Sequence, residues 1–166
     1  MKFNAKKILK EIVIGLVILF IASNVLSYLR QPTLDSNIFP ETKTALIDGD
    51  VFNSSEAKGK PLLVHFWALW CPTCKLEAPN IETLSKEYEV LSIVVNSGDN
   101  AKIKAYMEEN DLHFRVINDK DGHWAKQFKV EAFPSTFIYD ANATLQFTEV
   151  GYTTTVGLVT RMKMLQ

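Results

Sequence analysis

The longest apolar stretch in the chain lies near its beginning, where polar residues are rare. Residues 12–29 are apolar except for Ser23, Asn24 and Ser27, and four lysines precede them within the first ten residues. Eighteen helical residues span about 27 Å at ~1.5 Å each, close to the ~30 Å hydrocarbon core of a bilayer. The pattern predicts a transmembrane anchor over residues 12–29, with residues 1–11 in the cytoplasm by the positive-inside rule.

A cleaved signal peptide is the alternative interpretation of this stretch. Its apolar region would be only ~7–15 residues long and would end in a small-x-small site, which Ala22-Ser23-Asn24 matches poorly. The sequence therefore favours an uncleaved, single-pass anchor. Residues 30–41 show little periodicity and contain Pro32 and Pro40, so they predict a linker that holds a folded domain, residues 42–166, away from the membrane.

Beyond the linker, short β-branched or aromatic runs alternate with segments of helical periodicity. Two turn signals, Asp48-Gly49 and Ala141-Asn142, are each flanked by strand-like residues and predict antiparallel hairpins. The order of elements predicts an α/β fold with a mixed central sheet and helices on both of its faces. The expected strands are 44–47, 51–53, 62–67, 90–96, 114–117, 136–140 and 145–150, and the expected helices are 72–88, 100–110, 124–128 and 155–165.

Composition limits the classes of function. The 166 residues, 47% of them hydrophobic, suffice for one ordinary domain with its own core beside the anchor. The formal net charge is -1, and no basic run follows the first ten residues. A nucleic-acid partner is therefore not expected, because such proteins carry a basic surface.

The two cysteines of the chain, Cys71 and Cys74, form a Cys-x-x-Cys where the strand 62–67 passes into the helix 72–88. Pro72 is tolerated in a first helical turn, and Cys71 before it faces the free amide donors of that turn. Such positions lower a thiol pKa from ~8.5 into a range of roughly 3.5–7.5. The pair is predicted to be redox-active, since a structural disulfide closing so short a loop would add little stability.

Three segments resemble the thioredoxin superfamily, in particular its membrane-anchored, TlpA-like branch: FWALWCPTC, KLEAP and, some sixty residues on, FPSTFIYD. Within that branch, WCPTCKLEAPNI and the ending VGYTTTVGLVTRM are most similar to the ScsD-type protein disulfide oxidoreductases. The resemblance implies a thioredoxin-like fold and a protein thiol-disulfide oxidoreductase. It implies no metal and no organic cofactor.

The resemblance also implies a role for particular residues. Cys71 would attack a substrate disulfide, and Cys74 would resolve the mixed disulfide. Pro134 would be the family's cis-proline, and the backbone of Phe133 before it would pair with an extended substrate segment. Glu77 occupies the acidic position just beyond the motif, where it would exchange protons with the cysteines.

Four further residues near the motif are candidates. His65 stands six residues before Cys71, where thioredoxins carry a buried aspartate. An imidazole could take over that proton-handling role, or His65 could be an ordinary core residue. Trp70 beside the nucleophile either packs or lines a substrate-docking surface. Pro72 and Thr73, between the cysteines, are expected to border the bound substrate.

The direction of the reaction is predicted from charge. Pro72-Thr73 supplies no charge to stabilise a Cys71 thiolate, and Glu77 adds negative charge nearby, so the pair should be reducing rather than strongly oxidising. The expected partners are disulfide- or thiol-bearing proteins and a membrane-embedded thiol reductase as electron donor. The expected location is the inner (cytoplasmic) membrane, with the catalytic domain on the periplasmic side.

Two other classes of function use the same residues. A metal-binding module could hold copper or zinc with Cys71, Cys74 and a distant histidine such as His123. An anchored interaction domain without turnover would not need the thiol of Cys71 at all. Metal analysis of the reduced protein separates the first alternative from catalysis, and a Cys71→Ser phenotype separates the second.

Overall fold

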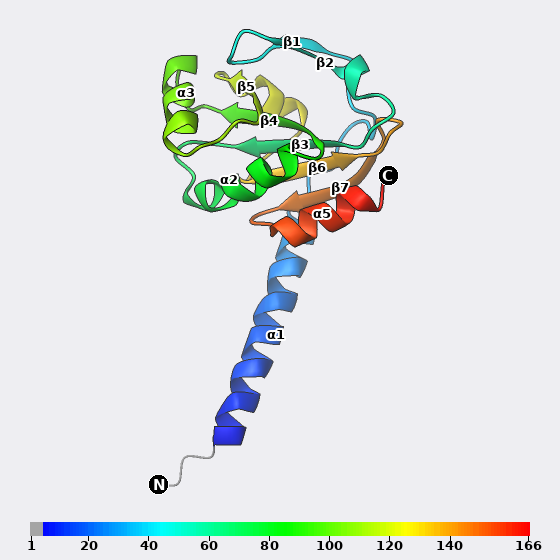
Figure 1. The fold of residues 1–166 in the computed structure, drawn as a ribbon. Helices are drawn as coiled ribbons and strands as arrows, with labels where there is room; N and C mark the ends of the chain where they lie inside the picture. The colour runs from blue at the N-terminus through cyan, green and yellow to red at the C-terminus, as the bar shows by residue number, and fades with distance from the viewer. Residues whose placement is uncertain (1–4) are drawn as a thin grey trace.

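A long helix, α1 (Ala5–Leu29), leads into a sheet-centred domain in the computed structural model, which describes residues 5–166 (Figure 1). Residues 1–4, part of the predicted cytoplasmic N-terminus, lie outside the described residues. The stretch Ile8–Leu29 of α1 is long and apolar enough to cross a membrane, and none of it is buried by the rest of the protein. This helix coincides with the predicted anchor and begins several residues earlier.

A mixed sheet of five strands, in the order β5-β4-β3-β6-β7, forms the centre of the domain. Strand β3 pairs in parallel with β4, and β4 with β5, whereas β6 runs antiparallel to both β3 and β7. The mixed sheet predicted from the order of elements is thus confirmed. The strands are β3 (Leu62–Trp67), β4 (Glu89–Val95), β5 (Arg115–Asp119), β6 (Ser135–Tyr139) and β7 (Leu145–Val150).

Helices cover both faces of this sheet. As a result, β3 is buried on both sides. Leu63 and Trp67 point into one core cluster, and the alternate residues Val64 and Phe66 point into the other. The first cluster lies under α2 (Pro72–Ser85), α3 (Asn100–Glu109) and α5 (Thr155–Lys163). The second lies under α4 (His123–Gln127) and the short 3-10 helix η1 (Ser54–Ala57).

The first hairpin differs from its prediction. Its strands β1 (Lys43–Ala45) and β2 (Val51–Asn53) form a separate two-stranded sheet, joined by residues 46–50 instead of a two-residue turn. Leu46 and Ile47 lie beyond the end of β1: the amide of Leu46 donates to the carbonyl of Asp50 within the turn, and both side chains are buried, one in each core cluster. The amide of Ile47 donates a hydrogen bond to the carbonyl of Val116 in β5, at 2.9 Å.

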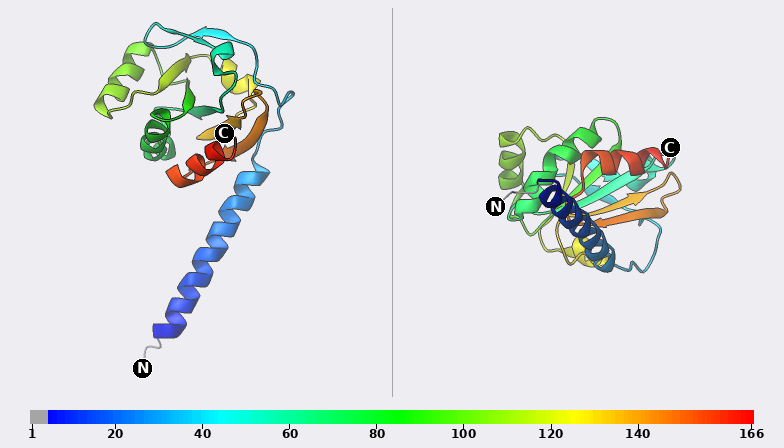
Figure 2. Two further views of the ribbon diagram at one scale, coloured as in Figure 1. Left: turned by 45° about the vertical axis from the view of Figure 1, so that its right-hand side comes forward. Right: turned by 90° about the horizontal axis from the view of Figure 1, so that it is seen from below.

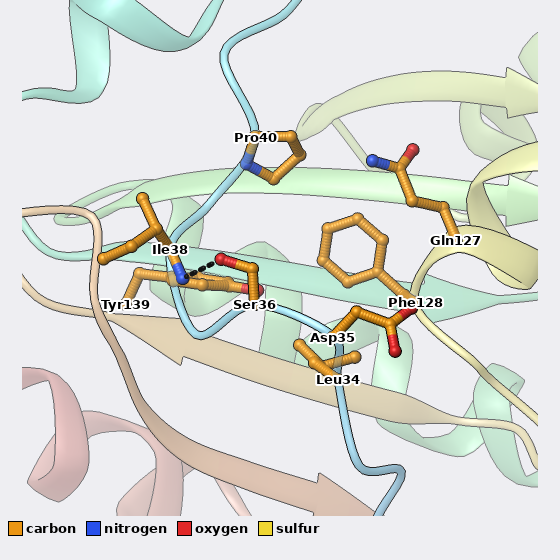
Figure 3. Close-up of a pocket in the computed structure, with 8 residues that line it drawn as sticks. All are labelled: Leu34, Asp35, Ser36, Ile38, Pro40, Gln127, Phe128 and Tyr139. Carbon is orange, nitrogen blue, oxygen red and sulfur yellow. Dashed lines mark hydrogen bonds between the residues drawn. The ribbon is translucent and has the colours of Figure 1, made fainter.

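The predicted linker, residues 30–41, is only partly a tether. The amide of Phe39 donates to the carbonyl of Ala143, and the amide of Leu145 donates to the carbonyl of Asn37. The ring of Phe39 is 4% exposed and packs edge-on against Tyr139. Figure 3 shows the segment Leu34 to Pro40 passing over Phe128 and Tyr139, where it lines a cavity of about 240 Å³. The folded domain therefore begins before residue 42.

Replacing Phe39 with Ala should destabilise the domain by roughly 3 kcal/mol, because the change removes a buried ring and leaves a cavity. The neighbouring Ile38→Ala is the matched control, since Ile38 is 52% exposed and should cost well under 1 kcal/mol. Urea unfolding of the full chain in detergent measures both. Equal, small effects would mean that residues 34–41 do not belong to the domain.

Candidate functional site

The two cysteines lie at the N-terminus of α2 and form a disulfide, with their Cα atoms 5.3 Å apart. Cys71 is the N-cap residue of α2, and its Sγ accepts a hydrogen bond from the amide of Cys74 at 3.1 Å. Cys71 is 5% exposed and Cys74 is fully buried. The attacking sulfur predicted from the sequence is therefore the outer one, and it lies against a free helix amide that favours negative charge.

The loop that carries Pro134 lies at the same end of the sheet. Its Phe133–Pro134 peptide bond is cis, as the resemblance implied. Strand β6 begins with the next residue, Ser135, which pairs with Phe66 near the end of β3 from which the chain continues to Cys71. The sequence separates these two segments by some sixty residues, and the pairing of β3 with β6 brings them together.

Trp70 links the two loops and remains largely open to solvent. Its ring packs edge-on against Phe133, with 5.5 Å between ring centres, and its indole N–H donates to the carbonyl of Asn96 at 3.3 Å. The side chain is nevertheless 60% exposed. Pro72 is exposed and Thr73 is half-buried beside it. These residues, with the half-buried Phe133, form the surface around the cysteine pair.

Glu77 is the most unusual group in the site, because its carboxyl is fully buried in the α2 face that carries Cys74. Residues three apart on a helix are neighbours, so the two side chains share one buried face. Glu77 Oε1 accepts a hydrogen bond from the amide of Thr153 at 2.8 Å, whereas Oε2 has no partner among the described residues. Burial raises the pKa of Glu77 from 4.5 to about 8, and the charge of Glu149 adds to the rise.

Glu149 and Arg161 were not predicted from the sequence. Glu149 in β7 forms an ion pair with Arg161 in α5 at 2.5 Å, and neither side chain is more than 28% exposed. Pairing of Glu149 with Thr136 places it on the face of the sheet that α2 and α5 cover. That Glu149 lies near Glu77 becomes apparent only from this strand register. The sequence showed Glu149 only as an acidic residue in a predicted strand.

His65 is a core residue in this structure. It is 2% exposed, and its Nδ1 lies 3.0 Å from the hydroxyl of Thr136 in the adjacent strand. Burial lowers the pKa of His65 from 6.5 to about 3, so the imidazole is neutral at physiological pH. An imidazole of that kind is a poor proton acceptor. The geometry therefore favours the packing interpretation of His65 over its use as the base.

The described residues do not support the metal-binding alternative. No group of three or more His, Cys, Asp or Glu among residues 5–166 lies close enough together to hold a metal ion. His123 is exposed at the start of α4, on the other side of the sheet from α2.

A Cys-x-x-Cys disulfide at a helix N-terminus, next to a cis-proline on a mixed five-stranded sheet, defines a protein of the thioredoxin-like class. The chain belongs to the Redoxin family, which matches residues 34–162. That match covers the domain and begins within the predicted linker, in agreement with the packing of residues 37–39.

Similar proteins and a solved structure agree with this assignment. The chain is 30% identical over 159 residues to a thioredoxin-like protein of Haemophilus influenzae, covering 95% of this chain and 94% of the relative. It is 30% identical to the thiol:disulfide interchange protein DsbE of Pseudomonas fluorescens, covering 68% and 65%. A secreted disulfide oxidoreductase of Mycobacterium tuberculosis, homologous to DsbE of E. coli, has the same fold, with a TM-score of 0.67 at 24% identity over 75% of this chain and 96% of that one.

The thioredoxin superfamily and its TlpA-like branch, predicted from the sequence, are confirmed. The resemblance to ScsD-type proteins stays a prediction. The chain is a protein thiol-disulfide oxidoreductase that acts on protein thiols and disulfides.

Glu77→Gln should change the pH dependence of stability. The raised pKa of Glu77 means that the folded state prefers the protonated carboxyl, so this contribution is full below about pH 4.5 and is lost as pH rises through about 8. The oxidised variant should match the parent near pH 5 and exceed it by on the order of 2–4 kcal/mol at pH 9. Urea unfolding at both pH values measures this.

Glu87→Gln is the control, because Glu87 is exposed just beyond α2 and its charge stays in water. A difference between Glu77→Gln and the parent that stays constant from pH 5 to pH 9 would contradict a buried carboxyl that holds its proton.

Proposed function

We propose that this chain is a membrane-anchored enzyme that reduces disulfides of other proteins outside the cytoplasm. The main support is the Cys71–Cys74 disulfide at the N-terminus of α2, together with the buried carboxyl of Glu77 on the helix face that carries Cys74. The cysteines suit disulfide exchange, and the carboxyl suits movement of a proton to and from the inner cysteine.

The reaction begins from the reduced pair. The Cys71 thiolate, stabilised by the first amides of α2, attacks one sulfur of a substrate disulfide, and the other substrate sulfur leaves as a thiolate. A mixed disulfide between Cys71 and the substrate results. Cys74 then attacks the sulfur of Cys71, which releases the substrate as a dithiol and leaves the Cys71–Cys74 disulfide. Two electrons from a donor restore the dithiol for the next cycle.

Glu77 is the residue proposed to handle the proton of Cys74. Cys74 is fully buried and must lose its proton before it can attack. The Thr153 amide occupies Oε1 of Glu77, which leaves Oε2 as the acceptor. A pKa of about 8 lets the carboxyl both accept and release a proton near neutral pH, whereas His65 cannot with a pKa of about 3.

Substrate contact is assigned to the surface around Cys71. Trp70 and Phe133 offer aromatic area that is already held in place by their mutual packing. Pro72 and Thr73 border the outer sulfur, and the backbone of Phe133 before the cis bond offers a place for an extended substrate segment to pair.

The location of the enzyme rests on α1. By the positive-inside rule, the lysines that precede its apolar stretch favour an N-terminus in the cytoplasm, which supports a domain on the other side of the membrane. In a cell with two membranes this is the periplasmic side of the inner membrane. A membrane-embedded thiol reductase is the donor that fits this placement, because it can carry electrons across the bilayer.

Replacing Cys74 with Ala should trap substrates as mixed disulfides, since Cys71 still attacks but nothing resolves the product. Cell envelopes that contain the variant should show protein adducts on non-reducing gels, and these should disappear with a thiol reductant. The double variant Cys71→Ala/Cys74→Ala should trap nothing. Equal adduct levels in both variants would show that Cys71 is not the nucleophile.

The direction of the reaction is testable by titration. The negative charge expected of Glu77 is largely absent at neutral pH, because burial raises its pKa to about 8. With no charged residue between the cysteines, the Cys71 thiol should still have a pKa near ~7 and the pair a potential toward the ~−270 mV of thioredoxin. Thiolate absorbance of the reduced protein across pH and equilibration with glutathione measure the two values. A pKa below ~5 with a potential near ~−120 mV would make the protein an oxidant instead.

A further inference from the structure

The C-terminal end of α1 is fastened to the domain by hydrogen bonds to β7. The hydroxyl of Ser27 accepts a hydrogen bond from the amide of Val150 at 3.2 Å. The side chain of Gln31 donates one to the carbonyl of Thr148 at 2.6 Å. The first of these contacts lies inside the apolar stretch Ile8–Leu29, so the domain is attached to the helix before that stretch ends.

This attachment fixes the height of the domain above a membrane. The 22 residues of Ile8–Leu29 extend about 33 Å, slightly more than the ~30 Å hydrocarbon core. The edge of the core therefore falls close to Ser27, and the Val150 amide lies beside it. Tyr152 is two residues further along the chain, at most about 7 Å away. The headgroup layer on each side of a bilayer is about 5–8 Å thick, so Tyr152 lies within its reach.

The surface next to this attachment has the chemistry of a membrane-contacting face. The elements next to this attachment carry four exposed large apolar residues: Leu76 in α2 (71%), Tyr152 just after β7 (50%), Val156 in α5 (75%) and Met164 at the C-cap of α5 (69%). On α5, the exposed residues Val156, Thr160 and Lys163 form an outward-facing stripe. The stripe continues to Met164, the C-cap residue of the helix. No acidic residue occurs in α5. Of the two basic residues in its last turn, Arg161 is paired with Glu149 and Lys163 is exposed.

These residues also lie on the correct side of the domain. Figures 1 and 2 show α5 and β7 at the end of the domain from which α1 leaves, while the β1–β2 hairpin lies at the far end. The hydroxyl of Tyr152 is hydrogen-bonded to Asn80, one helical turn after Leu76 in α2. Tyrosine with an apolar body and a polar tip is enriched where hydrocarbon meets headgroups.

We propose that this membrane-facing surface, made of Leu76, Tyr152, Val156 and Met164, rests in the headgroup layer of the bilayer that α1 crosses. The inference rests on the proposed membrane anchoring. The occupant of the surface is lipid, because the attachment at Ser27 leaves too little height for a protein layer between Tyr152 and the membrane. The amide of Gly151 donates to the carbonyl of Pro134, so the same segment joins the redox site to this surface.

The test compares two Val→Trp variants of the full chain in nanodiscs of phosphatidylethanolamine and phosphatidylglycerol. Val156→Trp places the probe on the membrane-facing surface, and Val51→Trp places it on β2 at the far end, where Val51 is 46% exposed. Lipids brominated near the headgroup end of their acyl chains quench tryptophan on contact. The probe at position 156 should lose about half of its added fluorescence or more, as expected for side chains seated at the headgroup boundary, and the probe at 51 should lose none.

A third variant separates failure of the anchor from failure of the docking. Leu26→Trp places the probe inside the apolar stretch of α1, and it should be quenched whenever α1 is inserted. Quenching at position 26 with equal, weak quenching at 156 and 51 would overturn the docking and leave the anchor standing. Absence of quenching at 26 would overturn both the anchor and the docking.

Discussion

Burial of β3 on both faces is the constraint on which the rest of the domain depends. Its six residues are all buried, so the strand must have neighbours on both edges and cover on both faces. After the buried strand ends, the chain turns and begins α2. This turn places Cys71 next to the first amides of α2, which lack partners within the helix. The pairing of β3 with β6 brings Pro134 to the same end. Burial of one strand thereby aligns two segments that are far apart in the sequence.

The same sheet carries a row of polar residues under α2. Register places Ser92, His65, Thr136 and Glu149 side by side across four strands, on the face that holds Leu63 and Trp67. His65 and Thr136 satisfy each other, and Arg161 balances Glu149. Glu77 enters this region from α2 and has no ion-pair partner among residues 5–166. Burial therefore favours the protonated carboxyl and raises its pKa to about 8, at which it can both hold and release a proton near neutral pH.

The sequence predicted those features of the protein that are determined by the local pattern of residues. A long apolar run located α1, short β-branched or aromatic runs located most strands, and the Cys-x-x-Cys with the distant proline located the redox site. What it missed depends on contacts between distant residues. Phe39 lies in a segment without periodicity, next to the exposed Ile38, so nothing local predicts its burial against Tyr139. The pairing of Glu149 with Thr136 follows from strand register, and the neutral state of His65 follows from how completely the core encloses it.

The attachment of α1 has a consequence for self-association. An open sheet ends in strands whose outward N–H and C=O groups can pair with another chain and cause aggregation. On β7 those groups at Thr148 and Val150 are already taken by Gln31 and Ser27, and on β5 the carbonyl of Val116 is taken by Ile47. Both borders of the sheet are thereby partly closed. A protein that acts on the disulfides of other proteins is protected in this way from adding their extended segments to its own sheet.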